Sequence, residues 1–211
     1  LNAQDFSNRA GTFQHSGKSD TRIKVEGQLD NSNGKLASTA SHLPLDVGQL
    51  LNNGGQIAHS GDAGLVVDAG AFSGVGGETS TAGSARLRLG DSDHRSATLS
   101  AKRIDLEAQS FDNRGGKVIA TGKEASQLDV FGGLDNGDGG TIAGNADLGI
   151  RAGTLGNAGG SILHAGDGRL DIEAATLHGE SGSIASNGEL RLGLEDYPLI
   201  KEQDHPTQQA A

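Results

Sequence analysis

One stretch of the sequence decides the fold of this chain: Phe111-Asp112-Asn113-Arg114-Gly115-Gly116-Lys117-Val118-Ile119-Ala120. Its frame is an apolar residue, an asparagine two positions later, a glycine three positions after that, and a second apolar residue two positions further on. Complete or degenerate copies of this frame begin at Phe6, Leu29, Leu50, Phe72, Phe111, Leu134, Leu155 and Leu177. Consecutive starts lie 21 to 23 residues apart, except for the 39 residues that separate Phe72 from Phe111.

A second pattern precedes most of these starts, in which two apolar residues flank a single outward position. The pairs are Ile23/Val25, Leu43/Leu45, Leu65/Val67, Ile104/Leu106, Leu128/Val130, Leu148/Ile150, Leu170/Ile172 and Leu190/Leu192. Strict alternation predicts a strand with one buried face. A unit of about 22 residues that holds strands and turns, with no helical period, predicts one coil of a parallel β-helix. The fold class is therefore all-β, with eight to ten coils.

The composition agrees with a narrow and regular interior. The 211 residues include 35 glycines, three prolines and no Cys, Met or Trp, so large apolar side chains are few. Stacking at roughly 4.8 Å per coil would align them in rows along one axis. We expect the frame asparagines to form a ladder or to bond their own turn, and the frame glycines to supply positive φ angles.

Charge and apolar patterning exclude several classes of protein. The net charge of −10 argues against nucleic acid and against anionic membrane surfaces as partners. No apolar run is long enough for membrane insertion as a helix. The absence of cysteine excludes disulfide scaffolds and thiolate metal sites.

The repeat divides the chain into a shaft and a tail. Residues 1–194 form the repeat shaft, and residues 195–211 are a non-repeat tail or cap that holds two of the three prolines. The long interval predicts an irregular coil or an insertion around 77–100. We expect an excursion from the regular coil there, and expect it to be the main binding feature. At the N-terminal end no cap fits, so that end is expected to be adhesive.

Three histidines share one position in the repeat. His15, His59 and His164 each lie nine residues after a start. Two coils along the axis is about 10 Å, which is too far for one metal ion to reach two ligands. We interpret them as ordinary turn or surface histidines.

The acidic run Leu134-Asp135-Asn136-Gly137-Asp138-Gly139-Gly140 is similar to a calcium loop. It lacks the ligand spacing of an EF-hand, so a widened turn is favoured over a weak calcium site.

An enzyme needs converging catalytic groups, and the sequence offers few. Asp105 and Glu107, like Asp171 and Glu173, alternate with inward residues and are expected to face solvent. The densest basic group is Arg86, Arg88, Lys102 and Arg103, for which a charged loop edge is favoured over a small-anion or glycan contact. We therefore predict no enzyme, assign no catalytic, cofactor or metal residue, and leave the binding residues unknown.

The segment from Phe111 to Ala120 resembles the repeat core of filamentous haemagglutinins, and the segments that begin at Leu134 and Leu155 look like further copies. The resemblance covers most of residues 1–194. It implies a right-handed parallel β-helix from the stalk of a large exoprotein that a Gram-negative bacterium exports by two-partner secretion. Such exoproteins include adhesins, haemolysins and the sticks of contact-dependent growth inhibition systems.

The same resemblance implies a structural function. The segment would project a distal adhesive or toxin domain from the cell surface, as part of a secreted virulence factor. It would contact a host or bacterial receptor or glycan, and an outer-membrane transporter would recognise an N-terminal domain that this stretch does not contain. The alternative is a β-helix enzyme that acts on polysaccharides, which should show a groove with clustered carboxylates.

Overall fold

Each repeat folds into one long and one short strand, because its apolar residues alternate and its glycines fall at the bends. The computed structural model describes residues 1–194. The first coil begins with β1 (Asn2–Ala3) and β2 (Phe6–Ser7). The long strands are β4 (Ile23–Asp30), β6 (His42–Leu51), β8 (Gly64–Ser73), β10 (Ser84–Asp93), β12 (Arg103–Asp112), β14 (Ser126–Asp135), β16 (Leu148–Gly156), β18 (Arg169–His178) and β20 (Glu189–Gly193). The short strands are β3 (Thr12–His15), β5 (Lys35–Ser38), β7 (Gln56–His59), β9 (Glu78–Thr81), β11 (Thr98–Ala101), β13 (Lys117–Ala120), β15 (Thr141–Gly144), β17 (Ser161–His164) and β19 (Ser183–Ser186).

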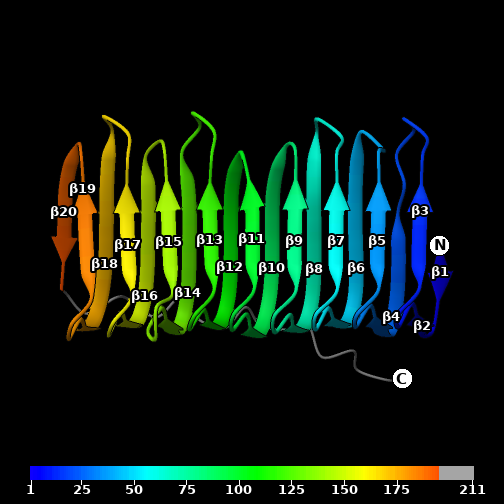
Figure 1. Ribbon diagram of the computed structural model, residues 1–211, viewed down its shortest axis with the longest axis horizontal. Helices are drawn as coiled ribbons and strands as arrows, with labels where there is room; N and C mark the ends of the chain where they lie inside the picture. Colours follow the sequence, from blue (N-terminus) through cyan, green and yellow to red (C-terminus); the bar gives the residue numbers. More distant parts are fainter. Residues whose placement is uncertain (195–211) are drawn as a thin grey trace, which may run out of the picture.

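The strands form two parallel sheets that face one another along the whole shaft. One sheet has eleven strands and the other has nine, and the chain visits them alternately (Figure 1). Each coil therefore pairs with the coil before it and the coil after it. The result is a parallel β-solenoid of about nine coils, as the repeat predicted. No helix long and apolar enough to cross a membrane occurs among residues 1–194.

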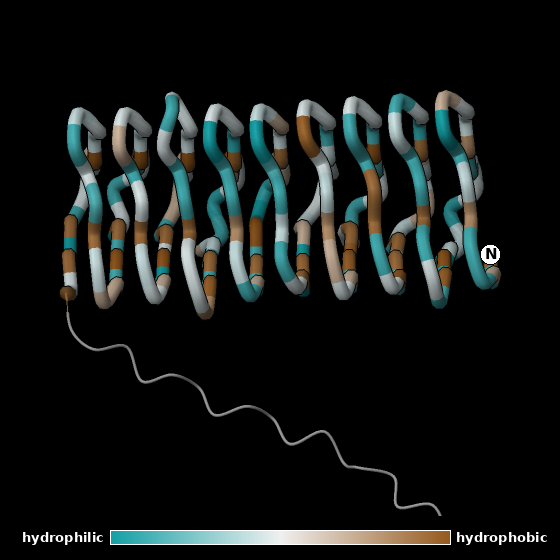
Figure 2. The backbone as a smooth tube through the Cα atoms, turned by 90° about the horizontal axis from the view of Figure 1, so that it is seen from below, coloured by the Kyte–Doolittle hydropathy of each residue, from teal (hydrophilic) through white to brown (hydrophobic). Residues whose placement is uncertain are grey.

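Equivalent residues of successive coils lie in rows. Leu29, Leu50 and Phe72 are register partners in the row of frame starts, and all three are buried. The alternating pairs that precede the starts form further inward rows. Figure 2 shows apolar stretches recurring at the same level in successive coils. The core is thus a set of narrow columns parallel to the axis.

The frame glycines do a different task from the one that the sequence suggested. The positive φ belongs to the residue before each frame glycine, as at Gly115 (φ 63°) and Ser96 (φ 55°). Gly116 itself has no positive φ, but a Cβ there would lie 2.6 Å from the carbonyl oxygen of His94 in the preceding coil. The frame requires glycine because consecutive turns approach one another closely.

The excursion predicted for residues around 77–100 is wrong, since the interval holds a further coil and no insertion. Strands β9, β10 and β11 pair in parallel with the coils on both sides. Ser92 is the register partner of both Phe72 and Phe111, so it occupies the start position. His94 and Ala97 then stand where the frame has asparagine and glycine. The irregularity lies in the sequence and leaves the backbone course unchanged.

The predicted asparagine ladder is present. Asn113 is fully buried, and its side-chain amide donates to Asn136 Oδ1 at 2.7 Å. Asn136 donates in the same direction to Asn157 Oδ1 at 2.8 Å. Each of these amide groups also donates to a turn carbonyl of the next coil, such as that of Thr141 at 3.3 Å. The ladder therefore ties consecutive turns together inside the shaft.

Both ends of the described shaft leave strands with a free edge. At one end Phe6 and Phe13 pack edge to face with their ring centroids 5.6 Å apart, and Leu1 is exposed. At the other, Leu190 and Leu192 on β20 are about half exposed. The predicted tail or cap, residues 195–211, lies outside the described residues.

Candidate functional site

Charged side chains cover the outer face of the large sheet in two rows parallel to the axis. One row contains Lys24, Asp46, Asp68, Arg88, Glu107, Asp129, Arg151 and Glu173. Its opposite charges pair between neighbouring coils: Arg151 lies 3.7 Å from Asp129 and 3.1 Å from Glu173. Exposed pairs of this kind contribute little to stability one by one. Together they give this face a nearly compensated charge.

The outward carboxylates that the sequence singled out lie on this face, as predicted. Asp105 accepts from Arg103 at 3.0 Å, and Glu107 lies 3.8 Å from Arg88. Asp171 belongs to the same row as Asp105, but it lies three coils away on β18. At about 4.8 Å per coil this separation is roughly 14 Å. The two carboxylate pairs are therefore not brought together into one catalytic arrangement.

The basic group predicted around Arg86 is paired with acids. Arg86 and Arg103 both approach Asp105, at 3.9 and 3.0 Å. Arg103 also lies 3.8 Å from Glu124, and Lys102 is exposed in the bend before β12. These residues form a charged edge between β10 and β12, in keeping with the favoured interpretation.

A second line of ion pairs follows the turns after the long strands. Arg95 donates to Asp93 at 2.7 Å and lies 3.7 Å from Asp112. Arg114 donates to Asp112 at 2.6 Å and lies 3.5 Å from Asp135. The hydrogen bond from Arg95 holds the pKa of Asp93 below its ordinary value, against the opposing effect of burial. This line joins three consecutive turns.

The acidic run at residues 134–140 forms the last of these turns. Its closing hydrogen bond runs from Gly140 N to Gly137 O, whereas the turn before it closes from Gly116 N to Asn113 O. The turn is therefore one residue longer than its neighbour, as the widened-turn interpretation expects. No group of three or more histidines and acids in the described part of the chain is placed to hold a metal ion.

The three histidines share one position around the coil, as predicted, but the surface assignment is wrong for two of them. His59 and His164 are buried, while His15 is partly exposed. His59 Nε2 donates to the carbonyl oxygen of Ala40 at 2.8 Å, and its Nδ1 accepts from the Thr81 hydroxyl at 2.9 Å. Burial lowers the pKa of His59.

Sequence reasoning missed a fourth inward histidine. His94 is 3% exposed and stacks between the rings of Phe72 and Phe111. The 39-residue interval contained the signal. Halving it places a start near Ser92 and an asparagine position at His94.

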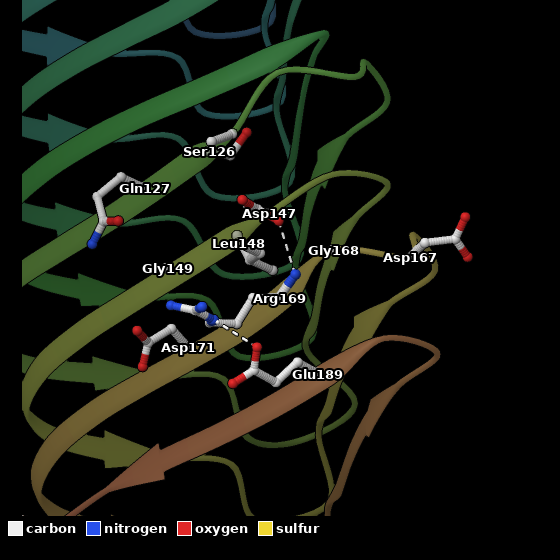
Figure 3. A pocket seen from close by; sticks show the side chains of 11 residues that line it. Ser126, Gln127, Asp147, Leu148, Gly149, Asp167, Gly168, Arg169, Asp171 and Glu189 are labelled. Atoms are coloured by element: carbon white, nitrogen blue, oxygen red, sulfur yellow. Dashed lines mark hydrogen bonds and ion pairs between the residues drawn. The ribbon is translucent and has the colours of Figure 1, made fainter.

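The largest surface hollow, about 410 Å³, lies over β14, β16 and β18, where Gly149 leaves a gap in the outer row (Figure 3). Asp147 accepts from the backbone N–H of Arg169 at 2.8 Å, and Arg169 donates to Glu189 at 3.1 Å. Asp171 also borders the hollow. Its polar groups mostly pair with one another, so the hollow is a break in the charged rows.

Comparison with known proteins is consistent with the repeat geometry. The family model described as haemagglutinin repeat matches residues 1–33, 16–75, 74–123 and 119–193. No curated protein and no solved structure matches the chain. The family matches follow one another along nearly the whole described shaft, across the coil at Ser92 as well. The chain therefore belongs to the haemagglutinin repeat family.

Proposed function

We propose that this chain is a shaft segment of a secreted, surface-exposed filament that holds a distal adhesive or toxin domain away from the cell. Membership of the haemagglutinin repeat family supports a secreted or surface-exposed protein of adhesin type. The observation that carries the proposal is the unbroken parallel pairing from β1 to β20. Nine coils at about 4.8 Å give a rod roughly 40 Å long.

The structure suits a spacer under load along its axis. Backbone hydrogen bonds of both sheets, the buried asparagine ladder and the ion-pair rows all join one coil to the next. In a solenoid each coil contacts only its neighbours, so length scales with coil number. Reach is thus set by how many coils the exoprotein contains.

The finer role extends this proposal. The exoprotein would leave a Gram-negative bacterium by two-partner secretion, guided by an outer-membrane transporter that recognises another domain of the same exoprotein. Its exposed charged rows would make weak contacts with a host or bacterial receptor or glycan. Adhesion and toxin delivery, as in contact-dependent growth inhibition, are both compatible with a spacer of this form.

The test is deletion of one coil from the whole exoprotein. Removing residues 134–154 joins the chain at equivalent positions, because Leu134 and Leu155 are register partners. We expect normal surface display and retained distal activity. The matched control removes residues 134–144, which puts the following strands out of register and should block display. If the in-register deletion abolishes adhesion while display and the distal domain stay intact, the shaft itself carries the binding and the proposal fails.

The alternative, a polysaccharide-acting enzyme, has less support. Its candidate carboxylates lie three coils apart and each pairs with an arginine. Only the hollow beside Gly149 gathers several acids. Incubating the chain with neutral and acidic polysaccharides, with an Asp171→Asn variant as control, should give no change in chain length. Depolymerisation that the variant loses would establish the enzyme.

A further inference from the structure

The asparagine ladder is interrupted in the middle of the shaft. Its N-terminal section ends at Asn52, whose amide donates to the carbonyl oxygen of Glu78 at 3.1 Å. Its C-terminal section begins at Asn113. Gly74 and His94 occupy the two ladder positions between these sections, as their backbone pairing shows. Two coils therefore lack the amide-to-amide bond.

The interruption is filled by a stack of three rings. His94 lies 5.3 Å from Phe111 with an interplanar angle of 24°, and 6.5 Å from Phe72 with an angle of 29°. The room comes from an exchange of volume between two rows. Small Ser92 stands where the coils on both sides have phenylalanine, and His94 occupies the freed space. Gly74 likewise leaves room for Phe72, since a Cβ on Gly74 would lie 2.6 Å from that ring.

The hydrogen bonds of Asn113 define the protonation state of His94. Asn113 Nδ2 donates to Asn136, so its Oδ1 is the atom that faces the imidazole. His94 Nδ1 lies 2.9 Å from this oxygen and must carry the proton. Acid would therefore add the second proton at Nε2, on a ring whose two faces are covered by phenyl groups. A buried charge without a hydrogen-bond partner is costly.

Charged groups around His94 lie outside the shaft wall. Its own coil carries Asp93 and Arg95, which bond to each other, and the following coil carries Asp112 and Arg114, which do the same. The preceding coil has Ser73 and Val75 at these positions.

None of these groups offsets the burial of the ring. Burial lowers the pKa of His94, against smaller opposing effects from the Asn113 hydrogen bond and from Asp93.

We propose that this interruption is an acid-sensitive joint: neutral His94 closes the shaft between Phe72 and Phe111, and protonation opens that coil while the coils on either side stay folded. Solenoid coils interact only with their neighbours, so one coil can open locally. The ladder sections before Asn52 and after Asn113 do not depend on His94. Ser92 adds to the weakness, because its hydroxyl is buried and makes no hydrogen bond within residues 1–194.

Acid acts in one direction only. An unfolded histidine has a pKa of about 6.5, so below that pH the open coil binds a proton that the closed coil excludes. The ratio of open to closed coil then rises by up to tenfold per pH unit, until the pH reaches the pKa of His94 in the closed coil. Between about pH 6.5 and pH 5 the rise is at most roughly 30-fold.

Hydrogen–deuterium exchange of the full chain at about pH 7.5 and pH 5, corrected for intrinsic exchange rates, tests the joint. We expect acid to increase exchange up to roughly 30-fold in peptides from β10 and β11, and far less in peptides from β6 and β16. The double variant Ser92→Leu, His94→Asn restores the regular frame and should abolish the acid response. If that variant does not fold, His94→Gln serves, because it keeps a polar side chain that does not titrate.

A second histidine provides the control. His59 is also buried, but both its ring nitrogens face oxygens, of Ala40 and Thr81, so its charged form keeps partners. His59→Thr should leave the response of β10 and β11 unchanged. The joint is refuted if acid raises exchange equally along the shaft, if β10 and β11 do not respond, or if their response persists after His94 is replaced.

Discussion

Replacing Asn113 by leucine tests how much the ladder stabilises the shaft. The change removes three hydrogen bonds, from His94 Nδ1 to Asn113 Oδ1 and from Asn113 Nδ2 to Asn136 Oδ1 and the Thr141 carbonyl. The three partner groups stay in or near the core without replacements. At about 1 kcal/mol or more per group, the loss should be about 3 kcal/mol.

The assay is thermal unfolding followed by circular dichroism. For a chain of this size, about 3 kcal/mol corresponds to a fall in melting temperature of roughly 6–12 °C. Asn145→Leu is the matched control, because Asn145 is exposed and its amide makes one bond, to the Thr121 carbonyl at 3.1 Å. It should change stability by less than about 0.5 kcal/mol. Equal melting temperatures for the two variants would refute a stabilising ladder.

Three further predictions concern other parts of the shaft. Gly116→Ala should destabilise by more than about 2 kcal/mol in urea unfolding, because its Cβ meets a backbone oxygen, whereas Gly133→Ala meets nothing within 4 Å and should be nearly neutral; similar midpoints would remove the close-approach argument. Because the pKa of His59 is lowered in the fold, its contribution to stability is present above about pH 6.5 and lost as the pH falls below it, so His59→Thr should flatten the pH dependence of the urea midpoint. The free N-terminal edge should cause self-association in sedimentation over a concentration series, which Phe6→Lys weakens; weakening by Leu192→Lys alone would place the adhesive end at β20 instead.

Much of the fold follows from the sequence because most rows keep one residue type. The frame at Phe111 gave the period, the strands and the ladder correctly. The coil at Ser92 escaped because two departures compensate each other: a small start residue and a large ladder residue together fill the same space. A pattern that scores each position separately cannot detect a conserved sum of volumes.

The buried histidines escaped for another reason. His59 lies two residues after inward Ile57 on the same short strand, so alternation alone placed it inside. The expectation of a surface position followed the polarity of the residue and ignored its phase. The charged face shows the opposite case, since alternation correctly put Asp105 and Glu107 outside.

The asparagine ladder also gives the shaft a direction. Each amide donates towards the C-terminal end, from Asn8 to Asn31 and from Asn136 to Asn157, so the side-chain dipoles add along the axis. Strand pairing is parallel throughout, but only the ladder makes the two ends chemically unlike. A coil joined before Asn8 would have to bring a donor, and a coil joined after Asn157 would have to bring an acceptor. Segments of this kind can therefore be concatenated in one order and cannot be reversed.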